Sequence, residues 1–373
     1  MVSAISKPLW WQKAEVAMIR KALIALALVL VIGATTAYVA RDSLLGWAIR
    51  QRIQQGPDQA FATDHNGIKV LICGTGTPEV SSARAQACTL VAAGGKLFLF
   101  DVGDGALRSL SASRIPVNDL EQVFVTHFHS DHFNDLGALI NAGWIWGRET
   151  PLTVAGPQGL AHVMAGFAEA YALDEGYRSA NMPHLAERRA IAGAVAREIA
   201  FGDGQRSVRV YDRGGVTIDA VLVAHEPVRP ALGYVLRYKG RKLFISGDTK
   251  VSPVNLPAMQ GADMVVHESY AGHMVRRAIP EMRKLGMEFD ARVAERTIPY
   301  HADNLALARQ AQAAGVKHLV LTHLIPNPDN AVVRAMYTEG MSELYKGPIT
   351  VAEDGMVLTL IATCSLWAAA PPG

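Results

Sequence analysis

The stretch Thr126-His127-Phe128-His129-Ser130-Asp131-His132 decides the fold, because it places three histidines and a carboxylate directly behind the apolar run 121–125. Imidazole nitrogens and carboxylate oxygens are ligands of zinc and its first-row neighbours. His127 and His129 are two residues apart and can bind one ion. Asp131 and His132 begin the next expected helix and can reach a second ion. The spacing therefore predicts a metal site where a strand ends.

Three further strand-like runs end in a metal-type ligand. His225 follows residues 216–224, Asp248 ends the run 242–247, and His323 ends the run 318–322. Open α/β sheets build their sites at the carboxyl ends of strands, so we expect these side chains to meet the first four. Seven ligands exceed what one tetrahedral zinc needs and suit two ions with one bridging carboxylate.

With these residues in place, the chain resembles the metallo-β-lactamase fold, and within it the branch of ribonuclease Z and arylsulfatase-like hydrolases. The resemblance implies a four-layer αβ/βα sandwich with two metals at one edge. The segment 171–201 has no counterpart in a minimal sandwich, and we expect it to be a helical cap insertion. The matching motifs lie at 74–78, 100–105, 126–132, 156–157, 225 with 232–234, 246–249, 267–269, 301–303 and 321–323.

The resemblance also implies how the ligands divide between two zinc ions, with manganese or iron as alternatives. One ion takes three histidines, the other takes an aspartate and two histidines, and a second aspartate bridges them. In that order the groups are His127, His129 and His225, then Asp131, His132 and His323, and lastly Asp248.

Further roles follow from the same resemblance. Asp101 is placed behind the ligands, where it orients one of them, and capping of the turn at 102–105 is an alternative or additional role. We expect Asp131 to accept a proton from the attacking water. His301, oriented by Glu268, is expected to protonate the leaving group, and the alternative is that it caps the helix beginning near residue 303. For His267 we expect only a supporting role in its loop.

The leading prediction for function is hydrolysis of a small phosphate or sulfate ester, arylsulfatase-like or phosphodiesterase-like. The alternative is a ribonuclease Z-type tRNA 3′ endonuclease. Such enzymes carry a tRNA-binding arm where this chain has only residues 226–247, and a membrane-targeting N-terminal run argues against tRNA, which is cytoplasmic. Nucleic acid is therefore expected to be an unlikely partner, and the net charge of +2 gives no strong steering toward it. More remote alternatives are a lactonase and a non-catalytic, membrane-tethered metal-binding protein.

The N-terminus carries an uncharged run of 19 residues, 22–40, which is long enough to cross a bilayer. We expect a single-pass signal anchor in the inner (cytoplasmic) membrane, with the catalytic domain periplasmic or otherwise extracytoplasmic. A cleaved signal peptide and a buried core helix are the alternatives. The expected parts are a cytoplasmic segment 1–21, the anchor 22–40, a juxtamembrane linker 41–60, the hydrolase domain 61–361 and a tail 362–373. The sequence does not determine the oligomeric state, and a homodimer is compatible with it.

Three cysteines are too few for a disulfide framework. We favour small buried hydrophobes, and the alternative is that Cys73 and Cys88 pair in an oxidising compartment. Cys364 lies in the tail. Strands are expected at 69–73, 89–92 and 96–100, and helices at 44–55, 131–146, 159–173, 183–199 and 303–314.

Overall fold

The computed structural model describes residues 9–54, 56–57, 59–63 and 66–362. The chain divides into two compact units, one ending at Gly56 and the other beginning at Pro57. The expected boundary between linker and hydrolase domain, after residue 60, lies four residues later. Cys364 and residues 1–8 and 363–373 lie outside the described residues.

The first unit consists of the helices α1 (Leu9–Val39) and α2 (Arg41–Gln54). Within α1, the segment Lys13–Val39 is long and apolar enough to cross a membrane, and none of it is buried. Signal sequences meet the same criteria of length and composition, so the transmembrane anchor stays a prediction. The helix expected at 44–55 is present and begins at Arg41.

The second unit contains two mixed sheets whose strand orders mirror one another. The first runs β14-β1-β2-β3-β4-β5-β6 and the second β13-β12-β11-β10-β9-β8-β7. The strands of the first sheet are β1 (Gly67–Gly74), β2 (Cys88–Ala93), β3 (Lys96–Phe100), β4 (Leu120–Phe124), β5 (Leu152–Gly156), β6 (Ala194–Glu198) and β14 (Met356–Ile361). Those of the second are β7 (Ser207–Arg213), β8 (Val216–Leu222), β9 (Leu232–Tyr238), β10 (Arg241–Ile245), β11 (Met264–Tyr270), β12 (Leu319–Ile325) and β13 (Ile349–Val351).

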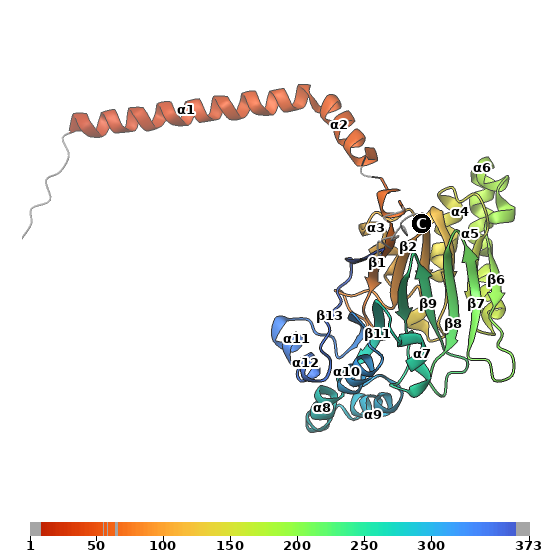
Figure 1. The fold of residues 1–373 in the computed structure, drawn as a ribbon. Coiled ribbons are helices and arrows are strands. Elements are labelled where there is room, and N and C mark those ends of the chain that lie inside the picture. Colours follow the sequence, from red (N-terminus) through yellow and green to blue (C-terminus); the bar gives the residue numbers. More distant parts are fainter. Residues whose placement is uncertain (1–8, 55, 58, 64–65, 363–373) are drawn as a thin grey trace, which may run out of the picture. The chain divides into compact units, whose positions relative to one another are not determined.

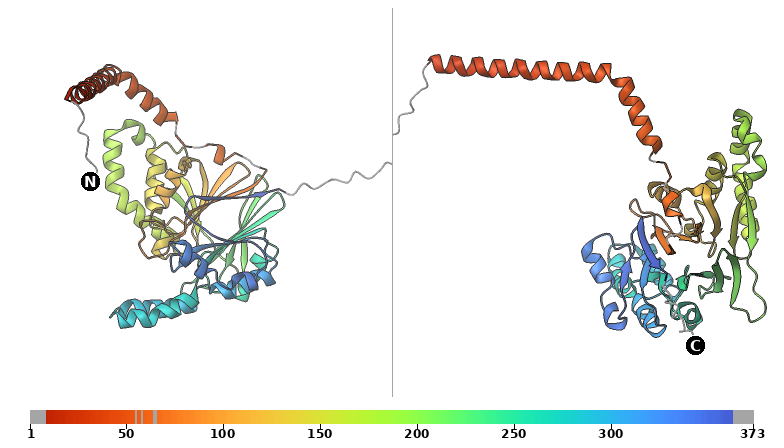
Figure 2. Two further views of the ribbon diagram at one scale, coloured as in Figure 1. Left: turned by 90° about the vertical axis from the view of Figure 1, so that its left-hand side faces the viewer. Right: turned by 45° about the horizontal axis from the view of Figure 1, so that its top comes forward.

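The two sheets pack face to face through an aromatic centre. The ring of Phe124 lies 5.0 Å from that of Phe100 and 5.1 Å from that of Tyr234, between ring centroids. Alternation along the strands sends these side chains inward and their neighbours, such as Val123, to the outer face. Apolar helices cover both outer faces, so the unit has four layers in the order helix, sheet, sheet, helix (Figures 1 and 2). The predicted αβ/βα sandwich is confirmed.

Helices on the outer face of the first sheet are α3 (Ala106–Ala112), α4 (Leu136–Ile145) and α5 (Leu160–Asn181), and α6 (Pro183–Ala186) follows α5. On the second sheet lie α7 (Leu256–Met259), α10 (Asn304–Ala313), α11 (Ala331–Tyr337) and α12 (Met341–Leu344). The helices α8 (Gly272–Lys284) and α9 (Glu288–Thr297) follow β11 and precede α10 in the chain, and they pack on each other.

Parallel pairing gives both sheets a common functional edge. Strands β3, β4, β5 and β6 are parallel neighbours, and so are β10, β11, β12 and β13. Because the carboxyl ends of parallel strands lie at the same edge of a sheet, the loops that follow them gather there.

The segment 183–199 was expected to be a helix, and that is wrong for its second half. Residues Ala194–Glu198 form β6, which pairs in parallel with β5 along its whole length. The composition Ala-Val-Ala-Arg-Glu favours a helix, but the open edge of β5 offers a complete set of backbone partners, and tertiary context overrides the local preference. The expected cap is therefore helical only as far as residue 191.

Two further expectations need correction. The segment 131–146 is not one helix, because a 3-10 turn at Ser130–His132 precedes α4, which starts at Leu136. Cys73 and Cys88 form a disulfide with 5.0 Å between their Cα atoms, whereas unpaired buried thiols were favoured. The antiparallel register of β1 and β2, in which Gly74 faces Cys88, brings the two together.

Candidate metal centre

The loop that follows β4 is held in place by Asp101. This carboxylate accepts hydrogen bonds from the Thr126 amide at 2.8 Å, from the Thr126 hydroxyl at 2.9 Å and from His132 Nδ1 at 2.8 Å. Its backbone lies in the left-handed region, with φ of 58°, which costs a residue other than glycine about 1–3 kcal/mol. The bond to Nδ1 fixes the His132 ring and leaves Nε2 facing the site.

One group of ligand-type atoms comes from His127, His129, His225 and Asp248, all lying within 4.8 Å of one another. His129 Nδ1 is 3.0 Å from His127 Nε2 and 3.4 Å from His225 Nε2. Asp248 Oδ2 lies 3.9 Å from His127 Nε2 and 3.8 Å from His225 Nε2. His225 Nδ1 donates to the carbonyl of Tyr300 at 3.2 Å, so its Nε2 points inward.

A second group consists of Asp131, His132 and His323. Asp131 Oδ2 is 3.1 Å from His323 Nε2 and 3.6 Å from His132 Nε2. Asp248 also approaches this group, with Oδ1 at 3.3 Å from His132 Nε2 and Oδ2 at 3.5 Å from His323 Nε2. The structure thus brings together all seven predicted ligands and places Asp248 between the two groups.

The donor atoms fit a pair of divalent ions. The closest separations, 3.0 to 3.9 Å, bracket the roughly 3.3 Å that tetrahedral zinc sets between two of its ligand atoms. Asp131 Oδ1, Asp248 Oδ1 and His132 Nε2 are buried and make no hydrogen bond within the described residues. Leaving such atoms without partners costs free energy, and an ion bound among them would satisfy all three.

The protonation of the three histidines of the first group also suits metal binding. Burial lowers the pKa of His127, His129 and His225, which keeps these imidazoles neutral with a free lone pair. For Asp248, burial opposes ionisation, but the neighbouring His323 and His132 hold its pKa well below the usual range. The first group therefore presents neutral nitrogens beside a carboxylate.

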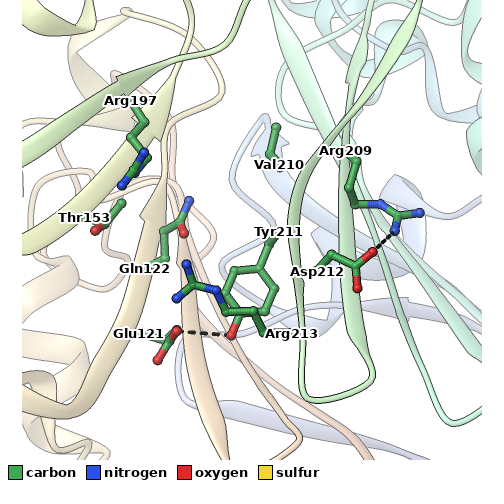
Figure 3. Close-up of a pocket in the computed structure, with 9 residues that line it drawn as sticks. All are labelled: Glu121, Gln122, Thr153, Arg197, Arg209, Val210, Tyr211, Asp212 and Arg213. Atoms are coloured by element: carbon green, nitrogen blue, oxygen red, sulfur yellow. Dashed lines mark hydrogen bonds and ion pairs between the residues drawn. The ribbon is translucent and has the colours of Figure 1, made fainter.

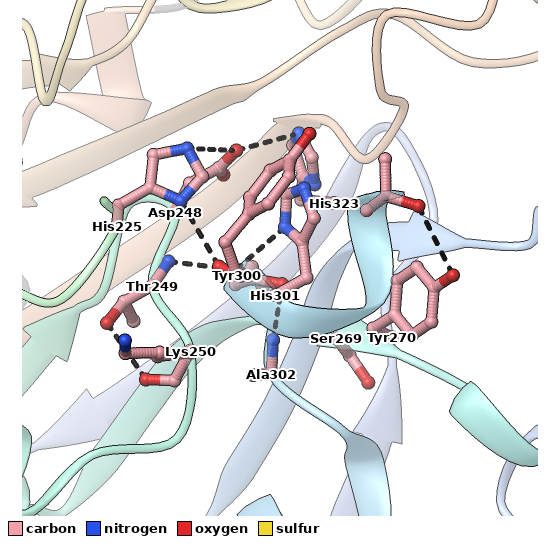
Figure 4. Close-up of polar contacts among 12 residues, drawn as sticks. His225, Asp248, Thr249, Lys250, Ser269, Tyr270, Tyr300, His301, Ala302 and His323 are labelled. Atoms are coloured by element: carbon pink, nitrogen blue, oxygen red, sulfur yellow. Dashed lines mark hydrogen bonds and ion pairs between the residues drawn. The ribbon is translucent and has the colours of Figure 1, made fainter. Parts of the chain in front are cut away.

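His301 and Glu268 form a buried pair beside the ligands. Glu268, in β11, accepts from His301 Nδ1 at 2.9 Å, from the Ala302 amide at 3.1 Å and from the Thr249 amide at 2.8 Å. Burial disfavours charge on His301, but Glu268 outweighs it and raises the pKa of His301 to about 9. Figure 4 shows His301 next to His225, Asp248 and His323.

The helix cap considered for His301 belongs to another residue. Asp303 is the N-cap of α10 and accepts from the amides of Leu305 and Ala306. His301 also lies with Asp248 and His323 in a group that could hold an ion. His267 is fully buried, donates through Nδ1 to the Glu268 carbonyl at 2.7 Å and belongs to none of the ligand groups.

Two features of the site were not predicted from the sequence. His323 lies within β12, not at its end, and its φ of 45° coincides with a break in register opposite Glu268 and Ser269. The Tyr300 ring lies 5.2 Å from that of His225, and the Tyr300 carbonyl accepts the hydrogen bond of His225 Nδ1. The only sequence signal for a role of Tyr300 in the site is its position next to His301.

Known proteins resemble this chain in sequence and in fold. A family model described as the metallo-beta-lactamase superfamily matches residues 82–271. A ribonuclease Z from Mycobacterium sp. (strain KMS) is 33% identical over 262 residues, covering 69% of this chain and 85% of that protein. A ribonuclease Z from Mycolicibacterium paratuberculosis (strain ATCC BAA-968 / K-10) is 34% identical over 262 residues, covering 69% and 86%.

Solved structures agree at the level of the fold. The metallo-beta-lactamase fold protein YhfI from Bacillus subtilis has a TM-score of 0.56 and 20% identity, covering 79% of this chain and 99% of its own. Human tRNase Z, short form, has a TM-score of 0.55 and 22% identity, covering 78% and 98%.

The expectation that nucleic acid is an unlikely partner is wrong. Relatives that match over 85% of their own length are ribonucleases by name, and RNA is the substrate that this name states. The missing arm and the membrane-targeting run misled, because neither excludes an RNA substrate held by another surface. The net charge of +2 averages over the whole chain and does not describe the surface around one site.

Proposed function

The chain belongs to the metallo-beta-lactamase superfamily, in its ribonuclease Z branch, and is a metal-dependent hydrolase of ester bonds; from this premise we propose that it cleaves phosphodiester bonds of RNA as a ribonuclease Z-type tRNA 3′ endonuclease. The observation that carries the proposal is the identity of 33% across 85% of a ribonuclease Z. The buried Glu268–His301 pair beside the seven ligand-type residues supports it.

We propose that two divalent ions, zinc in the first place with manganese or iron as alternatives, bind at this centre. His127, His129 and His225 would hold one ion and Asp131, His132 and His323 the other, with Asp248 shared. When bound, such a pair supplies an activated water and neutralises charge on the phosphodiester.

The side chains of the protein divide the proton transfers between two sides of the site. The Asp131 carboxylate is buried beside the site, and it can accept the proton of the attacking water while one of its oxygens binds an ion. His301 uses Nδ1 to bind Glu268, which leaves Nε2 as the nitrogen that can protonate the departing oxygen. Glu268 is fixed by two backbone amides, so it holds the His301 ring and favours its charged form.

One observation favours a second candidate, hydrolysis of a small phosphodiester. Residues 226–247, where the resemblance implies a tRNA-binding arm, contain only β9, β10 and the connecting loops and turn. An RNA substrate must therefore be held by some other surface of the protein, whereas a small ester needs no such arm.

For localisation, we propose a single-pass anchor at 22–40, with residues 1–21 in the cytoplasm and the catalytic unit outside it, joined by the linker 41–60. The apolar segment Lys13–Val39 supports the anchor, and the Cys73–Cys88 disulfide supports an oxidising compartment, because cytosolic thiols are kept reduced. This localisation goes with the small-ester candidate, because tRNA matures in the cytoplasm and the endonuclease would need the catalytic unit on the cytoplasmic side.

The deciding experiment compares two substrates for the full-length protein, purified in detergent and loaded with zinc. A precursor tRNA with a 3′ trailer and bis(p-nitrophenyl) phosphate are assayed side by side, with Asp248→Asn as the inactive control. Cleavage at the 3′ end of the tRNA body, at a kcat/KM above that for the small ester, supports the endonuclease. Turnover of the small ester alone supports the second candidate.

A further inference from the structure

A polar hollow of about 400 Å³ lies away from the metal centre, where the edge strands β6 and β7 face each other across the sandwich. Its walls are Glu121, Gln122, Thr153 and Arg197 on the first sheet and residues 209–213 on the second (Figure 3). The volume falls within the range of sites for small ligands. The hollow is thus large enough for a charged group.

The carboxylates in the hollow are already neutralised. Glu121 lies 3.1 Å from Lys96 Nζ and also accepts from the Tyr211 hydroxyl at 3.1 Å. Burial, followed by Glu121, raises the pKa of Tyr211 to about 12, so this hydroxyl stays protonated. Asp212 is paired with Arg209 at 2.7 Å, and Arg209 also bonds to Asp219. These acids offer little repulsion to an anion.

Two of the three arginines in the hollow keep their charge available. Within the described part of the chain, the side chains of Arg197 and Arg213 make neither a hydrogen bond nor an ion pair. Arg197 belongs to β6 and Arg213 to β7, so they approach the hollow from opposite sheets. Guanidinium groups bind phosphate oxygens through paired N–H donors.

Gln122 supplies an independent sign of a ligand. The residue is only 6% exposed, and its Nε2 has no hydrogen-bond partner in the described residues. Gln122 faces the space between the sheets from β4 and lines the hollow together with the Thr153 hydroxyl. A buried amide donor without a partner is costly unless a ligand or solvent satisfies it.

We propose that this hollow binds a phosphate-class oxyanion, held by the guanidinium groups of Arg197 and Arg213 and by the Gln122 amide. None of the ligand-type residues lines the hollow, and five residues of β4 and its loop, at most roughly 17 Å of extended chain, separate Gln122 from His127. The anion is therefore not the reacting group. It comes either from a small phosphorylated molecule or from the backbone of an RNA strand that extends beyond the scissile bond.

The test uses the zinc-loaded, full-length protein and the variant Arg197→Ala/Arg213→Ala, which changes two exposed side chains. Arg206→Ala/Arg309→Ala removes the same charge from exposed positions outside the hollow and is the matched control. Calorimetric titration with inorganic phosphate measures the affinity for a small phosphate-class anion. Binding of a single-stranded RNA at several salt concentrations measures the contacts to an RNA backbone. Neither measurement depends on cleavage.

We expect the Arg197/Arg213 variant to bind phosphate at least tenfold more weakly at one of its sites, with the control unchanged. If the anion belongs to RNA, the slope of log Kd against log salt concentration should also fall by about 1.4, the value for two lost phosphate contacts to a single strand. An RNA affinity that stays unchanged beside the loss of phosphate binding assigns the site to a small molecule. Equal behaviour of both variants in both titrations would overturn the proposal.

As a second variant, Gln122→Met removes the amide while keeping a similar volume. We expect it to weaken phosphate binding in the same titration, with an unchanged melting temperature. Full phosphate affinity in Gln122→Met would show that the buried amide takes no part in the site.

Discussion

Replacing His301 with alanine should lower kcat by about 10²–10⁴-fold, because the variant loses the group proposed to protonate the leaving oxygen. In energy, this is about 3–5 kcal/mol on the barrier. The metal content should not change, since the seven proposed ligands lie in the variant as before, and Asp303 still caps α10. Losing the ring also leaves Glu268 with its two amide donors, so the β11 side of the site stays ordered.

The assay has two arms that separate an acid from a ligand. Elemental analysis of His301→Ala gives the metal content, and turnover is compared for an alkyl phosphodiester and a p-nitrophenyl phosphodiester. The p-nitrophenolate leaves without protonation, so it should recover most of the lost rate. Glu268→Gln should lose less activity than His301→Ala, and the double variant should be no slower than His301→Ala alone, because Glu268 acts through His301.

The reasoning fails if His301→Ala loses an ion, because His301 also lies with Asp248 and His323 in a group that could hold one. It fails as well if the two esters lose rate equally, because protonation of the leaving group would then not be the missing step.

Elemental analysis of the zinc-saturated protein should give two ions per chain, and Asp248→Ala should lose both ions and all activity, since its carboxylate lies between the two ligand groups; one ion in the wild type would refute this. In Cys73→Ala/Cys88→Ala the free energy of unfolding should fall by about 3 kcal/mol, the value for a loop of 15 residues, so the variant should unfold at a lower denaturant concentration. An unchanged midpoint would mean that the disulfide does not form in the purified protein. The protein should sediment with membranes, and a C-terminal alkaline phosphatase fusion should be active; an inactive fusion beside a fluorescent cytoplasmic reporter would reverse the proposed topology.

The ligand residues could be predicted from sequence because each follows or ends a short apolar run, and the carboxyl ends of parallel strands meet by geometry. The bend at His323 could not, because its left-handed backbone comes from the mismatch in register between β11 and β12. β6 was missed for the same kind of reason. Its residues favour a helix, and only the free edge of β5 makes them a strand.

The disulfide and the substrate class depend on information that no single segment holds. Whether Cys73 meets Cys88 is set by the pairing of β1 with β2, which apolar patterns alone leave free to shift. RNA as a partner was rejected on a missing arm and a membrane-targeting segment, but relatedness to ribonucleases outweighs both.

The metal centre has a consequence for the order of events during synthesis. Asp131 and His323 lie 3.1 Å apart although they are 192 positions apart in the chain; Asp131 follows β4 of the first sheet and His323 belongs to β12 of the second. A growing chain thus carries four ligand residues early but cannot complete the second group until β12 has left the ribosome and paired with β11. We therefore expect chains that end before β12 to be inert as hydrolases, so that catalytic activity reports that both halves have folded against each other.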